Sequence, residues 1–255
     1  MSEQASNRKV IALVTGASSG LGAEFCRQLA DRCDVIIAVA RREERLTDIA
    51  KELEGTVEVH CLAADLGTVE GVAKTMETLR QKGPVDYLVN NAGFSTFGFF
   101  PDLPIEGQRE MVDVHIDASI TLSRAAVPFM KELGGGTIIN VSSLATFVPG
   151  KGLAVYGATK AFLNYFSIAL QAELAGTDIE VQALCPGYTH SEFHAEMVEG
   201  GFSKDRIPAE MWMTPDEVVS TSLAALGGGK VLVVPGEGNQ AMARMGLEQQ
   251  LAQLQ

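Results

Sequence analysis

The sequence has few cysteines, and none of them stands in a Cys-x-x-Cys arrangement. The four that it has are spread widely over 255 residues, at Cys26, Cys33, Cys61 and Cys185. Disulfide frameworks of secreted domains and structural zinc sites both need numerous or closely spaced cysteines. We therefore expect free thiols in a reducing compartment, which places the protein in the cytoplasm.

Long hydrophobic runs and an excess of positive charge are also missing. No apolar run approaches the length of a membrane span, and residues 1–8 are short and polar rather than a signal peptide. The formal net charge is −12, from 20 lysine and arginine residues against 32 acidic ones. Such a chain is repelled by nucleic acid and by anionic membrane surfaces, so we expect neither as a partner.

The sequence also lacks a convincing metal-binding pattern. His190 and His194 have the i, i+4 spacing of a zinc pair, but no third ligand pattern accompanies them. We expect no metal, and we interpret the two histidines as surface residues or as residues that cover a substrate.

Short apolar runs and helical patterns alternate along the chain. Several runs are rich in valine and isoleucine, which is typical of strands buried on both faces of a parallel sheet. The alternation predicts one α/β domain over residues 1–255, a Rossmann-type doubly wound parallel sheet of about seven strands with helices on both faces. The expected strands are 10–14, 35–40, 57–62, 87–89, 137–141, 180–184 and 231–234, and the expected helices are 22–32, 43–54, 68–81, 106–133, 155–175 and 215–225.

A glycine-rich segment follows the first expected strand and opens the first expected helix. It reads Thr15-Gly16-Ala17-Ser18-Ser19-Gly20-Leu21-Gly22. Glycines let the backbone turn sharply and let a pyrophosphate approach the helix N-terminus, where free N–H groups favour anions. A tight turn would explain the glycines equally well, but the strand before and the helix after favour dinucleotide binding. The candidate cofactor-binding residues here are Gly16, Ser18, Ser19, Gly20, Leu21 and Gly22.

Two arginines, Arg41 and Arg42, follow the second expected strand. Proteins that bind NAD carry an acid near this place, which binds the 2′-hydroxyl of the adenosine ribose. Two guanidinium groups suit a 2′-phosphate instead. The alternative is a solvated basic pair balanced by Glu43 and Glu44, but cations are unfavourable at the positive end of a helix. The sequence therefore predicts NADP(H) as the cofactor.

Tyr156 and Lys160 stand at i and i+4 of an expected helix, so both side chains project from one face. An ammonium beside a phenol favours phenolate, and we expect Lys160 to lower the Tyr156 pKa below its usual value of about 10. A hydroxyl such as Ser143 could hold a substrate oxygen within reach of that phenol. Such a pair alone is usually a surface coincidence. The glycine-rich segment and the alternating strands and helices favour a proton-transfer device.

Taken together, six motifs make the chain resemble the short-chain dehydrogenase/reductase family from about residue 9 to residue 235. The motifs are Thr15–Gly22, Asp65-Leu66, Asn90-Asn91-Ala92-Gly93, Asn140-Val141-Ser142-Ser143, Tyr156–Lys160 and Pro186-Gly187. The run Ala-Arg-Arg-Glu-Glu-Arg-Leu that begins at residue 40 is similar to the NADP-preferring branch of that family.

The resemblance implies a role for each motif. Thr15–Gly22 would bind the pyrophosphate, and Asp65 with Leu66 would lie at the adenine. Asn91, Ala92 and Gly93 would lie behind the adenosine, and Pro186, Gly187 and Thr189 would hold the nicotinamide. Tyr156 would exchange a proton with the substrate oxygen, Lys160 would bind the nicotinamide ribose, and Ser143 would orient the substrate, with Ser142 as its structural neighbour. The implied activity is reversible reduction of a ketone or aldehyde by NADPH.

One position departs from the family pattern. Val114-His115-Ile116 stands where the family often has Val-Asn-Val on a long helix. The resemblance implies that the backbone carbonyl at this place helps to hold a water that relays protons to Lys160. His115 is therefore a candidate catalytic residue. The alternative is a packed and hydrogen-bonded core histidine.

A segment at about 188–214 is expected to cover the substrate, and we call it the lid segment. Its Phe193, Met197, Phe202 and Trp212 suit an apolar substrate, such as a 3-oxoacyl compound, a steroid-like compound or an aryl ketone, although ordinary packing would explain them too. We expect a homodimer or homotetramer. The Met- and Gln-rich tail after residue 240 has no role that the sequence reveals beyond packing or subunit contact.

Two other functions compete with carbonyl reduction as interpretations of the sequence. A non-catalytic NADP(H)-binding sensor or structural subunit would have no reason to keep Ser143, Tyr156 and Lys160 together. Epimerases and dehydratases that act on nucleotide sugars generally carry a longer substrate domain after the last strand.

Overall fold

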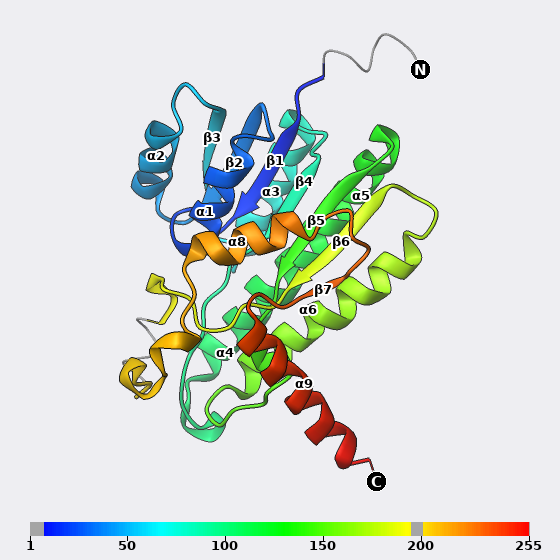
Figure 1. Cartoon of the computed structure of the whole chain (residues 1–255). Helices are drawn as coiled ribbons and strands as arrows, with labels where there is room; N and C mark the ends of the chain where they lie inside the picture. The colour runs from blue at the N-terminus through cyan, green and yellow to red at the C-terminus, as the bar shows by residue number, and fades with distance from the viewer. Residues whose placement is uncertain (1–7, 195–200, 255) are drawn as a thin grey trace.

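Seven parallel strands form one sheet in a computed structural model that describes residues 8–194 and 201–254. The strand order is β3-β2-β1-β4-β5-β6-β7, so the direction of chain progression reverses between the neighbours β1 and β4 (Figure 1). This arrangement confirms the predicted Rossmann-type sheet of about seven strands. The strands are β1 (Ile11–Thr15), β2 (Val35–Ala40), β3 (Glu58–Ala63), β4 (Tyr87–Asn90), β5 (Gly136–Val141), β6 (Ile179–Leu184) and β7 (Leu232–Val233).

Helices cover both faces of this sheet. One group of buried side chains joins one face of the sheet to α1 (Gly20–Leu29), α2 (Glu43–Glu52) and α8 (Pro215–Ala224). A second group joins the other face to α3 (Val69–Lys82), α5 (Ala118–Leu133) and α6 (Ala154–Glu173). All residues of β1 and β2 are buried, which accounts for their continuously apolar sequences. Only β3, at the sheet edge, is largely accessible.

The structure divides the single helix expected over 106–133. It contains α4 (Ile105–Val112), a π-helical turn (η3, Asp113–Asp117) and α5, and the three follow one another without a break. A π turn holds one more residue than an α turn, and such turns are frequent at functional sites. Here the turn contains His115, which is buried. The prediction of one regular helix was wrong because apolar periodicity does not reveal a single widened turn.

Two helices begin at threonine caps. Thr68 accepts a hydrogen bond from the Gly71 backbone N–H at the start of α3. Thr214 forms a reciprocal capping box with Glu217, with Pro215 as the first residue of α8. The last strand is shorter than expected, because only two of its residues pair with β6.

The C-terminal tail forms a long helix, α9 (Glu237–Ala252), which lies beside the lower end of α6 in Figure 1. It docks on the backbone of Phe147, whose carbonyl accepts a hydrogen bond of 3.0 Å from the Gln250 side chain. A Cβ at Gly246 would overlap the same carbonyl, so the absence of a side chain there permits the contact. Met242 and Ala243 pack with Leu144 and Phe147 in a third apolar group.

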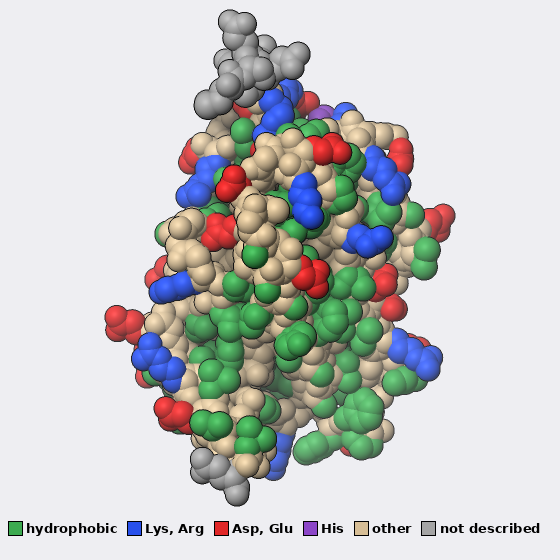
Figure 2. All heavy atoms as spheres, turned by 90° about the vertical axis from the view of Figure 1, so that its right-hand side faces the viewer, with side chains coloured by type: hydrophobic (Ala, Val, Ile, Leu, Met, Phe, Trp, Pro, Cys, Tyr) green, Lys and Arg blue, Asp and Glu red, His purple; other side chains and the backbone are tan. Residues whose placement is uncertain are grey.

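Hydrophobic side chains gather over the lower half of the face shown in Figure 2. Large apolar side chains are exposed along α6, at Phe162, Tyr165 and Ile168, and along α9, at Met245, Leu247 and Leu251. The expected homodimer or homotetramer stays a prediction, and these two helices are the surfaces that favour it. In the part of the chain that the structure describes, no helix is both long enough and apolar enough to cross a membrane.

Two glycines of α9 allow a matched test of the docking of this helix. We expect Gly246→Ala to lower the free energy of unfolding by about 1–3 kcal/mol, because the new methyl group overlaps the Phe147 carbonyl. Gly238→Ala should leave it unchanged or raise it by up to about 1 kcal/mol, since its Cβ meets no atom within 4 Å and alanine favours a helix. Urea unfolding of both variants measures the difference, and equal effects would contradict close docking.

Candidate active site

A cavity of about 740 Å³ lies where the carboxyl ends of the strands meet the loops that follow them. Ligands in open parallel sheets bind at this edge, at the point where the strand order reverses. The cavity brings together residues that lie far apart in the sequence. Of the predicted site residues, it is lined by Gly16, Ser18, Ser19, Gly20, Leu21, Arg41, Arg42, Asp65, Leu66, Asn91, Ala92, Gly93, Ser143, Tyr156, Lys160, Pro186, Gly187 and Thr189.

The two other predicted site residues, Gly22 and His115, do not line the cavity. A Cβ at Gly22 would overlap the Gly16 carbonyl. Gly22 therefore lets α1 pack against the loop that precedes it, which is the role that the third glycine of a dinucleotide loop takes.

The loop between β1 and α1 is held in place by hydrogen bonds to the loop after β4. Gly16 has φ 66°, and a Cβ there would lie 2.7 Å from the Asn91 side-chain nitrogen. That nitrogen donates to the Thr15 carbonyl at 2.8 Å, while the Thr15 hydroxyl accepts from the backbone N–H groups of Asn91 and Ala92. Asn91 thus braces the loop, and it has this structural role whatever ligand binds.

The start of α1 fits an anionic ligand. Ser19 is the N-cap, and its side chain makes no capping hydrogen bond to the helix. The first turn of α1 contains no acidic residue. Gly20 and Leu21 line the cavity here, so backbone N–H groups at the positive end of the helix dipole face the site. A pyrophosphate would find both hydrogen-bond donors and a favourable potential at this place.

Guanidinium and hydroxyl groups converge beside this loop. The Arg42 guanidinium donates to the Ser19 hydroxyl at 3.0 Å and to the Ser18 hydroxyl at 3.3 Å. It also forms an ion pair of 3.1 Å with Glu192, whereas Arg41 lies 3.5 Å from the Glu110 carboxylate. Both arginines are partly exposed, and both line the cavity. Two cations with two hydroxyl groups make a donor set that suits a phosphate monoester.

Asp65 and the segment after β6 line further parts of the cavity. The Asp65 carboxylate accepts a hydrogen bond of 3.0 Å from the Gly67 N–H, which orders the turn after β3. The Thr189 hydroxyl donates to the Gly187 carbonyl at 3.2 Å. Pro186 accepts a bond of 2.8 Å from the Leu144 N–H, so the segment after β6 is tied to the turn that carries Ser143.

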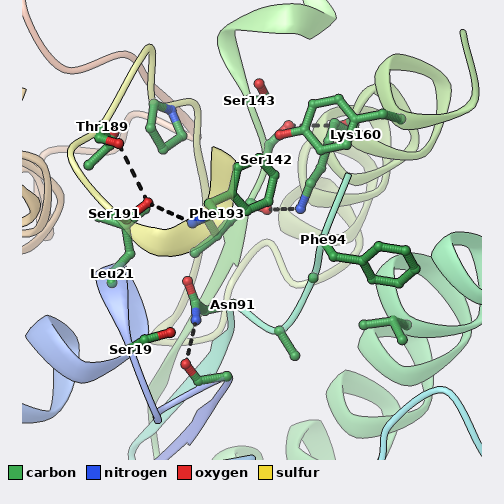
Figure 3. A pocket seen from close by; sticks show the side chains of 18 of the residues that line it. Ser19, Leu21, Asn91, Phe94, Ser142, Ser143, Lys160, Thr189, Ser191 and Phe193 are labelled. Carbon is green, nitrogen blue, oxygen red and sulfur yellow. Dashed lines mark hydrogen bonds between the residues drawn. The ribbon is translucent and has the colours of Figure 1, made fainter. Parts of the chain in front are cut away.

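The catalytic candidates meet at the far end of the cavity (Figure 3). Tyr156 and Lys160 lie in the first two turns of α6, and Ser143 is the N-cap of the short turn η4 (Leu144–Thr146). The Lys160 ammonium donates to the Val141 carbonyl at 2.8 Å, and the Ser142 hydroxyl donates to the Lys160 carbonyl at 2.9 Å. Both Ser142 and Ser143 line the cavity, but the Ser142 hydroxyl is bound to the backbone of α6.

Burial has the largest effect on the pKa values of Tyr156 and Lys160. It raises the pKa of the Tyr156 phenol to about 12, although a hydrogen bond with Ser143 acts in the opposite direction. Burial also lowers the pKa of the Lys160 ammonium to about 7. The Lys160 nitrogen lies 5.9 Å from the centre of the tyrosine ring. The expected lowering of the Tyr156 pKa below its usual value is not found, because loss of solvent is the largest influence on this pKa and raises it.

His115 does not line the cavity, but it is hydrogen-bonded to the loop after β4 and to α6. Its Nε2 accepts a hydrogen bond of 3.2 Å from the Phe94 N–H, so a neutral ring carries its proton on Nδ1. Nδ1 lies 2.9 Å from the Thr159 hydroxyl, which donates to the Tyr156 carbonyl at 2.8 Å. Burial, and then the charge of Lys160, hold the His115 pKa well below 6.5. These contacts favour the alternative of a hydrogen-bonded core residue.

Several lining residues at the catalytic end lie outside the motifs. They are mainly apolar, and they include Phe94, Leu144, Val148, Leu153, Tyr188, Phe193 and Met242. Phe193 packs on the ring of Tyr156, with 5.9 Å between the ring centres. Met242 comes from α9, a contribution that no local pattern in the tail could have indicated.

The apolar residues of the expected lid segment lie in different places. Phe193 lines the cavity, while Trp212 and Phe202 pack against Tyr188, at 5.4 and 6.2 Å between ring centres. Met197 lies outside the described residues. His190 stacks on Trp212, and among the described residues no three His, Cys, Asp or Glu side chains gather in a cluster that could hold a metal.

Comparison with known proteins identifies the family. A family model for short chain dehydrogenases matches residues 10–200. Sulfoacetaldehyde reductase 2 of Chromohalobacter salexigens is 36% identical over 186 residues, which cover 72% of this chain and 74% of that protein.

Solved structures agree over almost the whole length. A short-chain dehydrogenase from Sphingobium yanoikuyae in complex with NADPH is 32% identical, with a TM-score of 0.83 over 96% of this chain and 95% of that one. A bulky-bulky ketone specific alcohol dehydrogenase from Comamonas testosteroni is 29% identical, with a TM-score of 0.78 over 94% of each chain. The chain therefore belongs to the short-chain dehydrogenase/reductase family, and it is an oxidoreductase that acts on CH–OH and C=O groups.

Proposed function

We propose that this enzyme uses NADP(H) to reduce a bulky, apolar ketone or aldehyde to an alcohol, reversibly. The observation that carries the proposal is the composition of the cavity described above. Its two arginines, Arg41 and Arg42, lie beside the glycine-rich loop, whereas mainly apolar side chains lie around Ser143 and Tyr156 at the other end. A charged phosphate would be bound at one end and an apolar molecule at the other.

The chemistry follows from the groups at the catalytic end. A bound nicotinamide would supply the hydride, or accept it in the reverse direction. Tyr156 would donate its phenolic proton to the substrate oxygen, and the Ser143 hydroxyl would hydrogen-bond to that oxygen as charge develops on it. Lys160 has a pKa of about 7 and lies on the same helix face as Tyr156, so it can exist in either protonation state near neutral pH. That property suits a group that returns a proton to the tyrosine.

The apolar walls argue for the substrate class. Leu144, Val148 and Leu153 come from the segments that carry Ser143 and Tyr156, while Tyr188 and Met242 reach the cavity from the segments after β6 and β7. Lys160 is the one cation that the described part of the cavity lining has near Tyr156, and its nitrogen is bound to a backbone carbonyl. A sulfonate, as in the substrate that names the Chromohalobacter relative, would find no arginine there. The bulky ketones that name the Comamonas relative fit the apolar walls better.

The donor set beside the glycine-rich loop supports NADP(H). Arg41, Arg42, Ser18 and Ser19 offer charged and neutral donors to a 2′-phosphate, and the Sphingobium relative was solved with NADPH. The protein has a net charge of −12, so a polyanionic cofactor needs local cations to be bound.

Replacing Tyr156 by phenylalanine tests the catalytic assignment. We expect Tyr156→Phe to lower kcat by at least about 10²-fold, because general acid catalysis contributes roughly 10²–10⁴-fold. The dissociation constant of NADPH should stay within about twofold, since the change removes only the hydroxyl group. Tyr165→Phe is the control, because Tyr165 lies on the same helix with its side chain 76% exposed. Retention of more than a tenth of the wild-type rate with NADPH bound normally would show that Tyr156 is not the acid.

The cofactor assignment is tested by titrating NADPH and NADH into the wild type, Arg41→Asp and Arg42→Ala. We expect the wild type to bind NADPH at least about a hundredfold more tightly, since two charge-assisted contacts to the 2′-phosphate contribute that much. Arg41→Asp should weaken NADPH strongly and improve NADH modestly. Arg124→Asp makes the same change in net charge on α5, outside the cavity lining, and should leave both affinities unchanged. Equal wild-type affinities for the two cofactors would contradict the assignment.

A panel of carbonyl compounds tests the substrate class. We expect kcat/KM to rise with the apolar size of the ketone, because burial of apolar surface contributes about 25 cal/mol per Å². Sulfoacetaldehyde and acetone should be poor substrates compared with a decalone or an aryl ketone. Equal kcat/KM values across this panel, or a preference for the anionic aldehyde, would count against an apolar substrate.

A further inference from the structure

Ser191, Glu192 and Phe193 follow one another in the segment after β6, and each contacts a different part of the cavity lining. Ser191 lies against the glycine-rich loop, where a Cβ on Gly20 would be 3.2 Å from the Ser191 Cβ. Glu192 contacts the arginines of α2, and Phe193 packs on the ring of Tyr156. Figure 3 shows Ser191 and Phe193 inside the site, between Ser19 and Leu21 at the start of α1 and Lys160 of α6.

The Glu192 carboxylate binds two cations at once. One oxygen lies 3.1 Å from the Arg42 guanidinium, and the other lies 3.3 Å from that of Arg45. Arg42 also donates to the Ser18 and Ser19 hydroxyls. The carboxylate thus completes a set of donors that would otherwise suit the oxygens of a phosphate.

The local backbone presents Glu192 to these arginines. The Ser191 hydroxyl donates to the Thr189 carbonyl and accepts from the Phe193 N–H at 3.3 Å, which forms a tight turn around Glu192. Glu192 begins the short helix η5 (Glu192–His194), so its position relative to α2 is set by contacts on both sides.

We propose that Glu192 is a residue that determines cofactor affinity, because its carboxylate competes with the 2′-phosphate for Arg42. This rests on the proposed use of NADP(H), and it assigns to Glu192 a negative effect on the affinity for that cofactor. A 2′-phosphate that binds Arg42 must displace the carboxylate or lie close to it. Displacement breaks existing ion pairs, and proximity brings like charges together. Both effects weaken the binding of the phosphate, so the sign of the effect does not depend on which one occurs.

The solvent exposure of these side chains indicates how much the carboxylate changes the affinity for the phosphate. The side chains of Glu192, Arg42 and Arg45 are 51%, 43% and 49% exposed. Ion pairs at such accessible positions contribute little each. Removing the carboxylate should therefore change the affinity severalfold rather than by orders of magnitude, and added salt should reduce the change.

The test uses adenosine 2′,5′-bisphosphate and ADP as probes, because both lack the nicotinamide and only the first carries a 2′-phosphate. We expect Glu192→Gln to bind the bisphosphate roughly threefold to tenfold more tightly than the wild type, as the loss of two exposed ion pairs implies. Its affinity for ADP should be unchanged. Glu192→Ala should behave in the same way. Glu210→Gln, an exposed site in the same lid segment, is the control and should change neither affinity.

Isothermal titration calorimetry at two salt concentrations distinguishes the outcomes. If the wild type prefers the bisphosphate to ADP but both Glu192 variants bind it no more tightly, the competition is refuted and the proposed cofactor stands. Weaker binding of the bisphosphate by the variants would show that Glu192 supports the phosphate site, which also refutes it. If the wild type binds ADP as tightly as the bisphosphate, the proposed cofactor preference fails, and the inference that rests on it fails too.

Discussion

The parallel sheet imposes the constraint on which the rest of the structure depends. All seven strands run in the same direction, so the loops that follow them emerge at one edge. The carboxyl ends of β1 and β2 place the glycine-rich loop beside Arg41 and Arg42, and those of β5 and β6 place Ser143 beside Pro186. Hydrogen bonds of the backbone ladder determine these separations. The site is therefore a consequence of the buried sheet, and the loops need only short segments to reach one another.

Burial has a second consequence at the catalytic end. Lys160 and His115 are both almost fully buried and lie on neighbouring elements, so two positive charges there would be strongly unfavourable. The structure resolves this by keeping His115 neutral, with Nε2 accepting from Phe94 and Nδ1 directed to Thr159. The imidazole can then join the loop after β4 to α6 without adding charge beside the lysine. The π turn widens the helix at this position and carries the ring inward.

Sequence reasoning succeeded where a structure depends on local pattern. The glycine-rich segment follows β1 and opens α1, and Tyr156 and Lys160 lie one turn apart in α6, as their spacing predicted. It failed where a property depends on distant contacts. The pKa of Tyr156 follows from how deeply α6 is buried, and the contribution of Met242 follows from how α9 docks on Phe147. The ion pairs of Glu192 with α2 join segments that no spacing rule relates.

The two ends of the cavity share the segment after β6, but they differ in the other parts of the chain that line them. The end with Arg41 and Arg42 is lined by the loops after β1, β2 and β3, by Asn91 after β4 and by Ser191 and Glu192 after β6. The end with Ser143 and Tyr156 is lined in addition by Leu144 and Val148 beside Ser143, by Leu153 before Tyr156 and by Met242 of α9, none of which is a motif residue. Substitutions in these walls would change the shape of this end of the cavity without replacing Ser143, Tyr156 or Lys160. Relatives named for sulfoacetaldehyde and for bulky ketones share about a third of this sequence, a range that such changes in the walls would permit.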